Sequence, residues 1–288
     1  DLSNIGTVEK KHLQKIVQLF PDLRFLDLSG SEKLSNISAE LAQLPKLEFL
    51  ILRNCPLIDD TDGIEIAKLQ NLRDLEISGS HRLTDNFVNG LANHPRLQKL
   101  RLSRCSELAN PRINNIANLK LLEVFACPKL LSPQIHNLPK LEELIISDCT
   151  KLHSLDIAHL EALELINLAY CSSFRYFIDF GVIKNIKYLN LSHCNLNDQF
   201  NFGDRFHKLQ ELNVSDNNLS FHLKSYLKKM KGLKVLDISE NPITGGIKDA
   251  LLDLTKLEYL NIRGSNMDKR EAREFLHHHL PEIKHIEF

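Results

Sequence analysis

The stretch LEELIISDCTKL at residues 141–152 repeats along the chain with changes that leave one pattern intact. Its counterparts are LRFLDLSGSEKL at 23–34, LRDLEISGSHRL at 72–83 and LQKLRLSRCSEL at 97–108. In each stretch, apolar residues hold the first, fourth and sixth positions, and a Cys or Ser holds the ninth. Such regular recurrence is typical of a solenoid, in which every repeat is one structural unit.

The same pattern recurs in eleven units, with Cys, Asn or Ser at the ninth position. The units begin at Leu23, Leu47, Leu72, Leu97, Leu119, Leu141, Leu163, Ile186, Leu209, Leu233 and Leu257. A truncated unit, formed by Ile283, Ile286 and Phe288, closes the chain. The units resemble the leucine-rich repeat family over residues 23–288. Those with Cys resemble its cysteine-containing subclass, and the last four resemble its Asn-ladder type.

The resemblance implies an α/β solenoid. A curved parallel sheet lines its concave face, and helices, 3₁₀ turns and loops form its convex face. We expect one domain over 23–288, including a C-terminal cap made by a helix at 267–280 and the strand IKHIEF. Residues 1–22 are expected to form an N-terminal capping helix. Its apolar residues recur at roughly helical spacing: Val8, Leu13, Ile16, Leu19 and Phe20. The alternative for this segment is the tail of an F-box.

Unit length predicts the convex wall. The longer units carry helix signals, with Asp85 as an N-cap and helical spacing in LSFHLKSYLKKM (219–230) and KREAREFLHHHL (269–280). The middle units are shorter and contain Pro111, Pro133 and Pro139, so we expect only turns or short 3₁₀ segments there.

Six cysteines share the ninth position: Cys55, Cys105, Cys127, Cys149, Cys171 and Cys194. A nucleophile, a zinc ligand and a disulfide are the reactive interpretations. No His recurs beside them, no CxxC or CxxxC spacing occurs, and parallel neighbours rarely meet disulfide torsions. We therefore expect buried free thiols, no metal, no cofactor, and a reducing, cytoplasmic compartment.

The chain is nearly neutral, so it has no overall electrostatic potential that would attract nucleic acid or an anionic membrane. Lys plus Arg number 36 against 37 for Asp plus Glu, and no apolar run approaches the roughly 18 residues of a membrane span. We expect a monomer that binds neither nucleic acid nor membrane. Since the chain begins at Asp1 rather than at a methionine, we also expect it to be part of a longer protein.

The third, fifth and seventh positions of each unit are expected to face outward on the concave surface. Three kinds of side chain there predict a protein-binding site: a central apolar strip, two apolar residues nearer the N-terminus, and basic residues that orient the partner. The strip contains Leu121, Phe125, Ile145, Leu165 and Tyr188, with Tyr170 near its edge; the others are Phe49, Ile51, Lys99, Arg101 and Arg104. The fifth-position Asn residues are expected to form a neutral, undiscriminating ladder.

The predicted function is recognition of a protein partner without catalysis, because no acid–base pair, phosphate loop or nucleophile constellation occurs. The alternative is the substrate-recognition subunit of a ubiquitin ligase, which cysteine-type units of this family imply. The Asn-, Lys- and Ile-rich texture also resembles secreted effectors of intracellular bacteria such as Legionella. That resemblance implies action in host cytosol.

Overall fold

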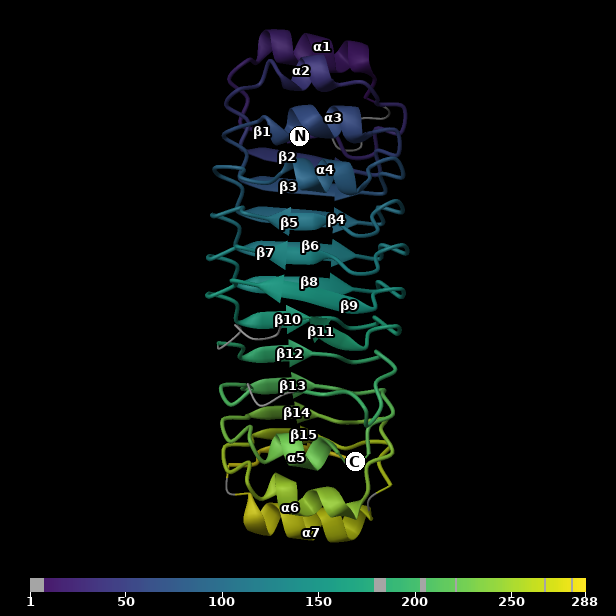
Figure 1. Ribbon diagram of the computed structural model, residues 1–288, viewed down its shortest axis with the longest axis vertical. Helices are drawn as coiled ribbons and strands as arrows, with labels where there is room; N and C mark the ends of the chain where they lie inside the picture. Colours follow the sequence, from purple (N-terminus) through teal and green to yellow (C-terminus); the bar gives the residue numbers. More distant parts are fainter. Residues whose placement is uncertain (1–7, 179–184, 203–205, 221, 267, 281) are drawn as a thin grey trace.

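The computed structural model describes residues 8–178, 185–202, 206–220, 222–266, 268–280 and 282–288. These residues form an elongated two-layer solenoid (Figure 1). One layer is a parallel sheet of twelve strands. Its strands, in spatial order, are β1 (Phe25–Asp27), β2 (Phe49–Arg53), β3 (Asp74–Ser78), β4 (Lys99–Ser103), β6 (Leu121–Phe125), β8 (Glu143–Ser147), β10 (Leu165–Asn167), β12 (Tyr188–Asn190), β13 (Glu211–Asn213), β14 (Val235–Asp237), β15 (Tyr259–Asn261) and β16 (His285–Glu287).

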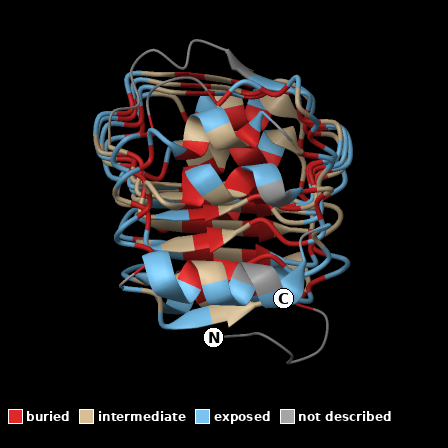
Figure 2. Cartoon of the chain, turned by 90° about the horizontal axis from the view of Figure 1, so that it is seen from below, coloured by how far each residue is buried: buried red, intermediate tan, exposed pale blue. Residues whose placement is uncertain are grey.

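The repeat register predicted from the sequence is confirmed strand by strand. Each of the twelve strands begins at the third position of its unit, from Phe25 after Leu23 to His285 after Ile283. Neighbouring strands pair in register, so that third positions lie beside third positions. The fourth- and sixth-position side chains of the eleven full units are buried between the layers, where Figure 2 shows the buried residues gathered.

The second layer changes character along the solenoid. Helices cover both ends and a parallel sheet of four strands covers the middle. In chain order its elements are α2 (Ser38–Leu41), α3 (Asp60–Ala67), α4 (Asp85–Gly90), β5 (Arg112–Asn114), β7 (Gln134–His136), β9 (Ser154–Ala158), β11 (Tyr176–Ile178), α5 (Leu223–Leu227), η2 (Gly245–Ile247) and α6 (Lys248–Leu251).

The prediction of turns or 3₁₀ segments in the middle units is wrong. Pro111 and Pro133 do exclude a helix there, but each directly precedes a strand, a place that proline tolerates. Their carbonyls still take part in pairing: the Gln134 N–H donates to the Pro111 oxygen at 3.0 Å, and the Asp156 N–H to the Pro133 oxygen at 3.3 Å.

Helices α1 (Lys10–Leu19) and α7 (Lys269–His279) lie at opposite ends of the solenoid (Figure 1). Of the capping helix expected at 1–22, residues 1–7 lie outside the described residues, and within the rest α1 covers only Lys10–Leu19. This helix packs against α2, and its apolar face is narrower than predicted. Leu13 and Val17 are buried, whereas Leu19 is 71% and Phe20 57% exposed. At the other end, α7 and β16 form the predicted C-terminal cap.

The predicted N-cap of α4 is off by one residue. Thr84 caps the helix, because its hydroxyl accepts from the Asn86 N–H at 3.2 Å. Asp85 is the first helical residue, and its carboxylate instead accepts from the N–H groups of Ala109 and Asn110 in the next unit, both at 2.9 Å. The side chain thus links two units rather than ending one helix.

A left-handed residue ends every strand of the eleven units. The eighth position has positive φ throughout: Gly30, Asn54, Gly79, Arg104, Ala126, Asp148, Tyr170, His193, Asp216, Glu240 and Gly264. For the first ten units, the N–H of this residue donates to the seventh-position carbonyl of the next unit at 2.7–3.0 Å. This bond holds a backbone conformation that L-residues adopt only at a cost of about 1 kcal/mol or more.

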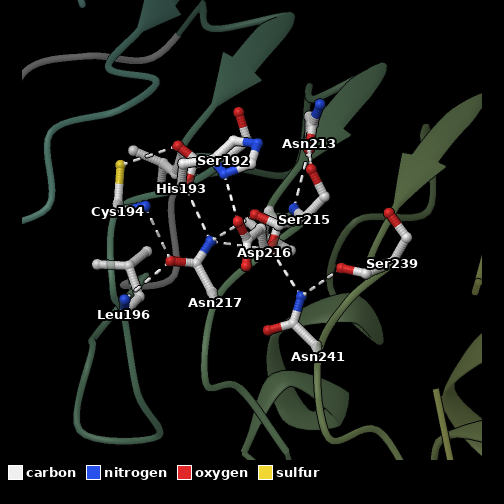
Figure 3. A network of polar contacts seen from close by, with 12 residues as sticks. Ser192, His193, Cys194, Leu196, Asn213, Ser215, Asp216, Asn217, Ser239 and Asn241 are labelled. Carbon is white, nitrogen blue, oxygen red and sulfur yellow. Dashed lines mark hydrogen bonds and ion pairs between the residues drawn. The ribbon is translucent and has the colours of Figure 1, made fainter. Parts of the chain in front are cut away.

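The ninth position forms a second ladder (Figure 3). The thiols of Cys171 and Cys194 donate to the sixth-position carbonyls of the preceding units, at 3.3 and 3.0 Å. Asn241 donates to the equivalent Val214 carbonyl at 2.8 Å, and its Oδ1 also accepts from the Leu219 N–H at 3.0 Å. Cysteine therefore supplies one of the two directions of bonding that asparagine supplies. All six cysteines are buried and free, as predicted.

Replacing Asn241 by alanine is expected to lower the free energy of unfolding by about 1–3 kcal/mol, because the buried Leu219 N–H loses its acceptor and the Val214 carbonyl keeps only the bond from the Asn217 amide. Asn241→Cys restores only the donor and should fall between alanine and wild type. The exposed Asn218 gives the control, since Asn218→Ala is expected to change stability by less than about 0.5 kcal/mol. Urea unfolding measures all three, and equal values for Asn241→Ala and Asn218→Ala would contradict the ladder's role.

Gly63 is required by the packing of α3 against α4. A Cβ at this position would lie 2.5 Å from Phe87 Cδ2 in the buried layer. Gly63→Ala is expected to cost about 1–3 kcal/mol of unfolding free energy despite better helix propensity. Gly90 in α4 has open space around its Cβ position, so Gly90→Ala should stabilise by up to about 1 kcal/mol. Thermal or urea unfolding of the pair tests the sign difference.

Candidate functional site

The outward face of the twelve-stranded sheet is formed by the third-, fifth- and seventh-position side chains, and we call it the sheet face. These side chains alternate with the buried fourth and sixth positions, as in β6, where Leu121 and Glu123 are half-buried and Leu122 and Val124 are buried. The sheet face is therefore the surface on which residues vary without disturbing the core.

Several charged side chains on the sheet face of the first five units pair with one another. The Arg53 guanidinium donates to both carboxylate oxygens of Glu76, one at 2.8 Å, and this hydrogen bonding raises the pKa of Arg53. Arg101 donates to Asp74 at 2.9 Å and lies 3.5 Å from Glu123. Arg101 is thus neutralised by acids of its own chain. This weakens the predicted role of the basic trio, Lys99, Arg101 and Arg104, in orienting a partner.

The other two members of the trio lie apart. Lys99 is exposed at the third position of β4. Arg104 is exposed at the left-handed eighth position, where its side chain belongs to the edge of the sheet rather than to the sheet face. Arg101 and Lys99 share a strand, but the three residues form no single basic patch.

The predicted apolar strip is interrupted. In the third-position row, Glu143 lies between Leu121 and Leu165. In the fifth-position row, Ile145 lies between Glu123 and Asn167. The prediction of one continuous strip is wrong. It was based on the units with apolar third positions and left out Glu143, which lies in the same row.

Three of the remaining predicted residues lie at two separate places, Phe125 on β6 and both Phe49 and Ile51 on β2. Phe125 is 37% exposed and lies beside Ser103 and Ser147 of the adjoining strands. Phe49 contacts the ring of Phe25 with centroids 6.3 Å apart, several strands toward the N-terminus. Ile51, at the fifth position of the same strand, pairs with Asp27 and Glu76.

Only Ile145, Leu165 and Tyr188 come together, at the edge of a concavity of about 380 Å³ that we call the sheet hollow. Its third-position floor continues through Glu211, Val235 and Tyr259, and its fifth-position floor consists of Asn167, Asn190, Asn213 and Asp237. The sequence prediction missed the C-terminal half of this surface. The signal was present, since Tyr188, Val235 and Tyr259 occupy the row that was used to place Leu165.

The fifth-position amides have a fixed orientation. Asn167, Asn190 and Asn213 each accept the N–H of the seventh-position residue through Oδ1, at 2.9–3.0 Å. A backbone N–H requires an acceptor, so each Nδ2 must be the free end of its amide. Within the described part of the chain, no acceptor takes these three NH₂ groups. They form a row of oriented donors, and the expected undiscriminating ladder is corrected accordingly.

Carboxylates flank the apolar part of the hollow. Glu211 lies in the lining of the hollow, and Glu143 lies just outside the lining, beside Leu165. Both are exposed, and neither forms an ion pair with a described residue. Asp237 accepts from the Ser239 hydroxyl at 2.6 Å and from the Asn261 amide at 3.2 Å. Burial and a hydrogen bond to Glu287 raise the pKa of Tyr259 to about 12, so its hydroxyl is neutral at physiological pH.

A second cluster lies on the edge of the sheet, at the left-handed eighth positions. Tyr170 is 52% exposed and stacks on His193, with ring centroids 4.2 Å apart and planes 7° apart. His193 Nδ1 pairs with the Asp216 carboxylate (Figure 3). Tyr170 was expected near the edge of the apolar strip, but it stacks on His193, which in turn pairs with Asp216.

No group of three or more His, Cys, Asp or Glu side chains that could hold a metal ion occurs among the described residues. The three consecutive histidines of α7, His277, His278 and His279, are all exposed. Within the same ranges, no helix is both long enough and apolar enough to cross a membrane.

The fold and the sheet face define a class: a solenoid of single-strand units that presents a wide, side-chain-variable sheet. Leucine-rich repeat family models match residues 207–267 and 182–199. The chain is a leucine-rich repeat protein.

Two curated relatives come from Arabidopsis thaliana. A disease resistance protein is 35% identical over 108 residues, which are 37% of this chain and 10% of that protein. The receptor protein-tyrosine kinase CEPR1 is 38% identical over 80 residues, which are 27% of this chain and 8% of the kinase. The matched segments therefore span a tenth or less of the length of these relatives.

Two solved structures share the fold. An internalin (inlF) from Listeria monocytogenes superposes with a TM-score of 0.50 at 18% identity, over 97% of this chain and 88% of its own. A chain of an octameric complex of latrophilin 3, Unc5D and the leucine-rich repeats of FLRT2 superposes with a TM-score of 0.54 at 17% identity, over 85% and 84%. At this identity the likeness concerns the fold alone.

The ninth-position thiols are expected to be inert in the folded protein. Burial raises the pKa of Cys55 to about 11 and those of Cys171 and Cys194 to about 12, so these three form almost no thiolate at pH 8. Hydrogen bonds from the Cys105 and Cys149 thiols lower the pKa of Cys127, but its side chain is fully buried and out of reach of a reagent. A thiol-reactive chromophore should label none of the six cysteines rapidly in buffer and all six in denaturant. Fast labelling of a native cysteine would contradict its place in the buried ladder.

Proposed function

We propose that this chain is a non-catalytic scaffold that binds a protein partner on its sheet face, with the sheet hollow as the centre of the interface. The observation that carries the proposal is the composition of the hollow. Apolar side chains lie beside a row of oriented amide donors, a combination typical of protein-binding surfaces.

The comparisons support the same role at a coarser level. The chain is similar to segments of a disease resistance protein and of a receptor kinase, and the leucine-rich repeats of FLRT2 occur in a complex with latrophilin 3 and Unc5D. A solenoid separates a stacked core from a freely variable face, and this separation suits recognition of large surfaces. Nothing in the described residues forms a nucleophile, base and oxyanion arrangement.

We also propose a reducing compartment, the cytoplasm or, for a secreted bacterial effector, the host cytosol. Six free, buried cysteines support this location, because oxidising compartments favour paired cysteines. A monomer and the absence of nucleic-acid binding belong to the same proposal. Substrate recognition for a ubiquitin ligase remains the alternative. Only the cysteine-type units favour it, and it would also require a ligase-recruiting domain or subunit.

A photoreactive phenylalanine analogue in place of Tyr188 tests the position of the interface. We expect it to form a covalent adduct with a protein partner in cell extract, because Tyr188 lies in the floor of the hollow. The same analogue in place of Arg112, exposed on β5 of the opposite layer, is the matched control and should form no such adduct.

Leu165→Asp, added to the Tyr188 probe, should reduce the adduct at least about tenfold, since it buries a charge against the partner. Folding of each variant is checked by circular dichroism. Adducts that form at Arg112 but not at Tyr188 would place the interface on the opposite layer and contradict the proposal.

A further inference from the structure

We infer that the sheet hollow recognises an extended segment of the partner with the pattern basic-x-apolar-x-basic. This inference rests on the protein-binding role proposed above and specifies its chemistry. The two basic side chains meet Glu143 and Glu211, and the apolar side chain between them rests on Leu165 and Tyr188.

The order of residues across the sheet carries the argument. Strand pairing places Glu143, Leu165, Tyr188 and Glu211 next to one another at the third positions of four consecutive strands. Two apolar side chains are thus bracketed by two carboxylates. A partner that covers the apolar pair brings its neighbouring side chains directly over the two acids.

These carboxylates lack the internal partners that others on the sheet have. Glu76 is bonded to Arg53, and Asp74 and Glu123 to Arg101. Two of the second-position lysines are also paired within the chain, Lys120 with Glu142 at 3.1 Å and Lys187 with Glu164 at 2.7 Å. The chain itself therefore leaves Glu143 and Glu211 to be neutralised by whatever covers them.

Burying an unpaired carboxylate under a partner costs on the order of several kcal/mol. The partner must therefore supply one cation for Glu143 and another for Glu211. Asp237, on the same floor, adds a third negative charge without a cation beside it. The same charges repel phosphate groups and acidic peptides. Charge complementarity thus selects a basic protein segment over a nucleic acid.

The spacing selects an extended conformation. Glu143 and Glu211 lie three strands apart, which is roughly 14 Å at about 4.8 Å per strand. In an extended segment, residues i, i+2 and i+4 share one face, and i to i+4 spans roughly 13–14 Å. In a helix, residues i and i+7 on one face are about 10.5 Å apart, and residues i and i+11 are about 16.5 Å apart. Neither distance matches the separation of the two carboxylates. The Asn amides beside this row offer donors to the backbone carbonyls of the segment.

Fluorescent synthetic peptides test the pattern directly. The first contains Lys-Ser-Leu-Ser-Lys, and its three comparisons replace both lysines by Glu, replace Leu by Gly, or shorten the core to Lys-Leu-Lys. A single-stranded oligonucleotide provides a polyanion. Anisotropy titrations at low salt measure the dissociation constant, or the ratio of initial slopes where binding does not saturate.

We expect the basic peptide to bind at least about tenfold more tightly than the acidic peptide and more tightly than the other two. Glu143→Gln and Glu211→Gln should each weaken it about two- to fivefold, as for exposed ion pairs, and the double variant by about the product. Glu161→Gln, at an exposed acid away from the hollow, should leave binding unchanged.

Equal binding of basic and acidic peptides, tighter binding of the oligonucleotide, or an unchanged double variant would overturn the inference. The photocrosslinking experiment separates this failure from failure of the proposed function. An adduct at Tyr188 that persists in Glu143→Gln/Glu211→Gln would leave protein recognition in place and eliminate the basic segment as its ligand. Loss of the adduct in that variant, with tight basic-peptide binding to wild type, supports both.

Discussion

The solenoid depends on one backbone hydrogen bond, from the left-handed eighth position of a unit to the seventh-position carbonyl of the next. It recurs ten times with nearly constant length. The bond forms at the point where the chain leaves the strand, so it fixes both the direction of the turn and the register of the following strand. A one-residue shift would exchange the buried and exposed faces of a strand, and this bond opposes such a shift.

The ninth-position ladder stabilises the same turn from inside. Asparagine serves it best, because one amide both donates and accepts. Cysteine fills the same space with a weaker donor and no comparable acceptor, yet six units use it. The larger part of the turn's stability therefore comes from the backbone bond and the surrounding leucines, and the side chain at the ninth position adjusts it.

Periodicity predicted the sheet because the buried residues repeat: Leu at the first and fourth positions states the register directly. The convex wall was harder to predict. Pro111 and Pro133 exclude a helix, but each is compatible with either a turn or a short strand. Neighbouring carbonyls, which the local sequence does not reveal, decide between the two. The sheet hollow was missed for a similar reason. Glu143 is visible in sequence once every unit is aligned, whereas the concavity that joins Leu165 and Tyr188 to Val235 and Tyr259 depends on how the units pack against one another.

Strand length follows from the fifth position. Where that residue is Asp or Asn, as in β1, β10, β12, β13, β14 and β15, its oxygen takes the seventh-position N–H and the strand has three residues. Where it is Ile, Glu or Arg, as in β2, β3, β4, β6 and β8, the strand has five. The two halves of the sheet face therefore differ in evolutionary freedom. The N-terminal half can change three rows of side chains to suit a new ligand, whereas the C-terminal half must keep one row for its turns and adapt mainly through the third positions.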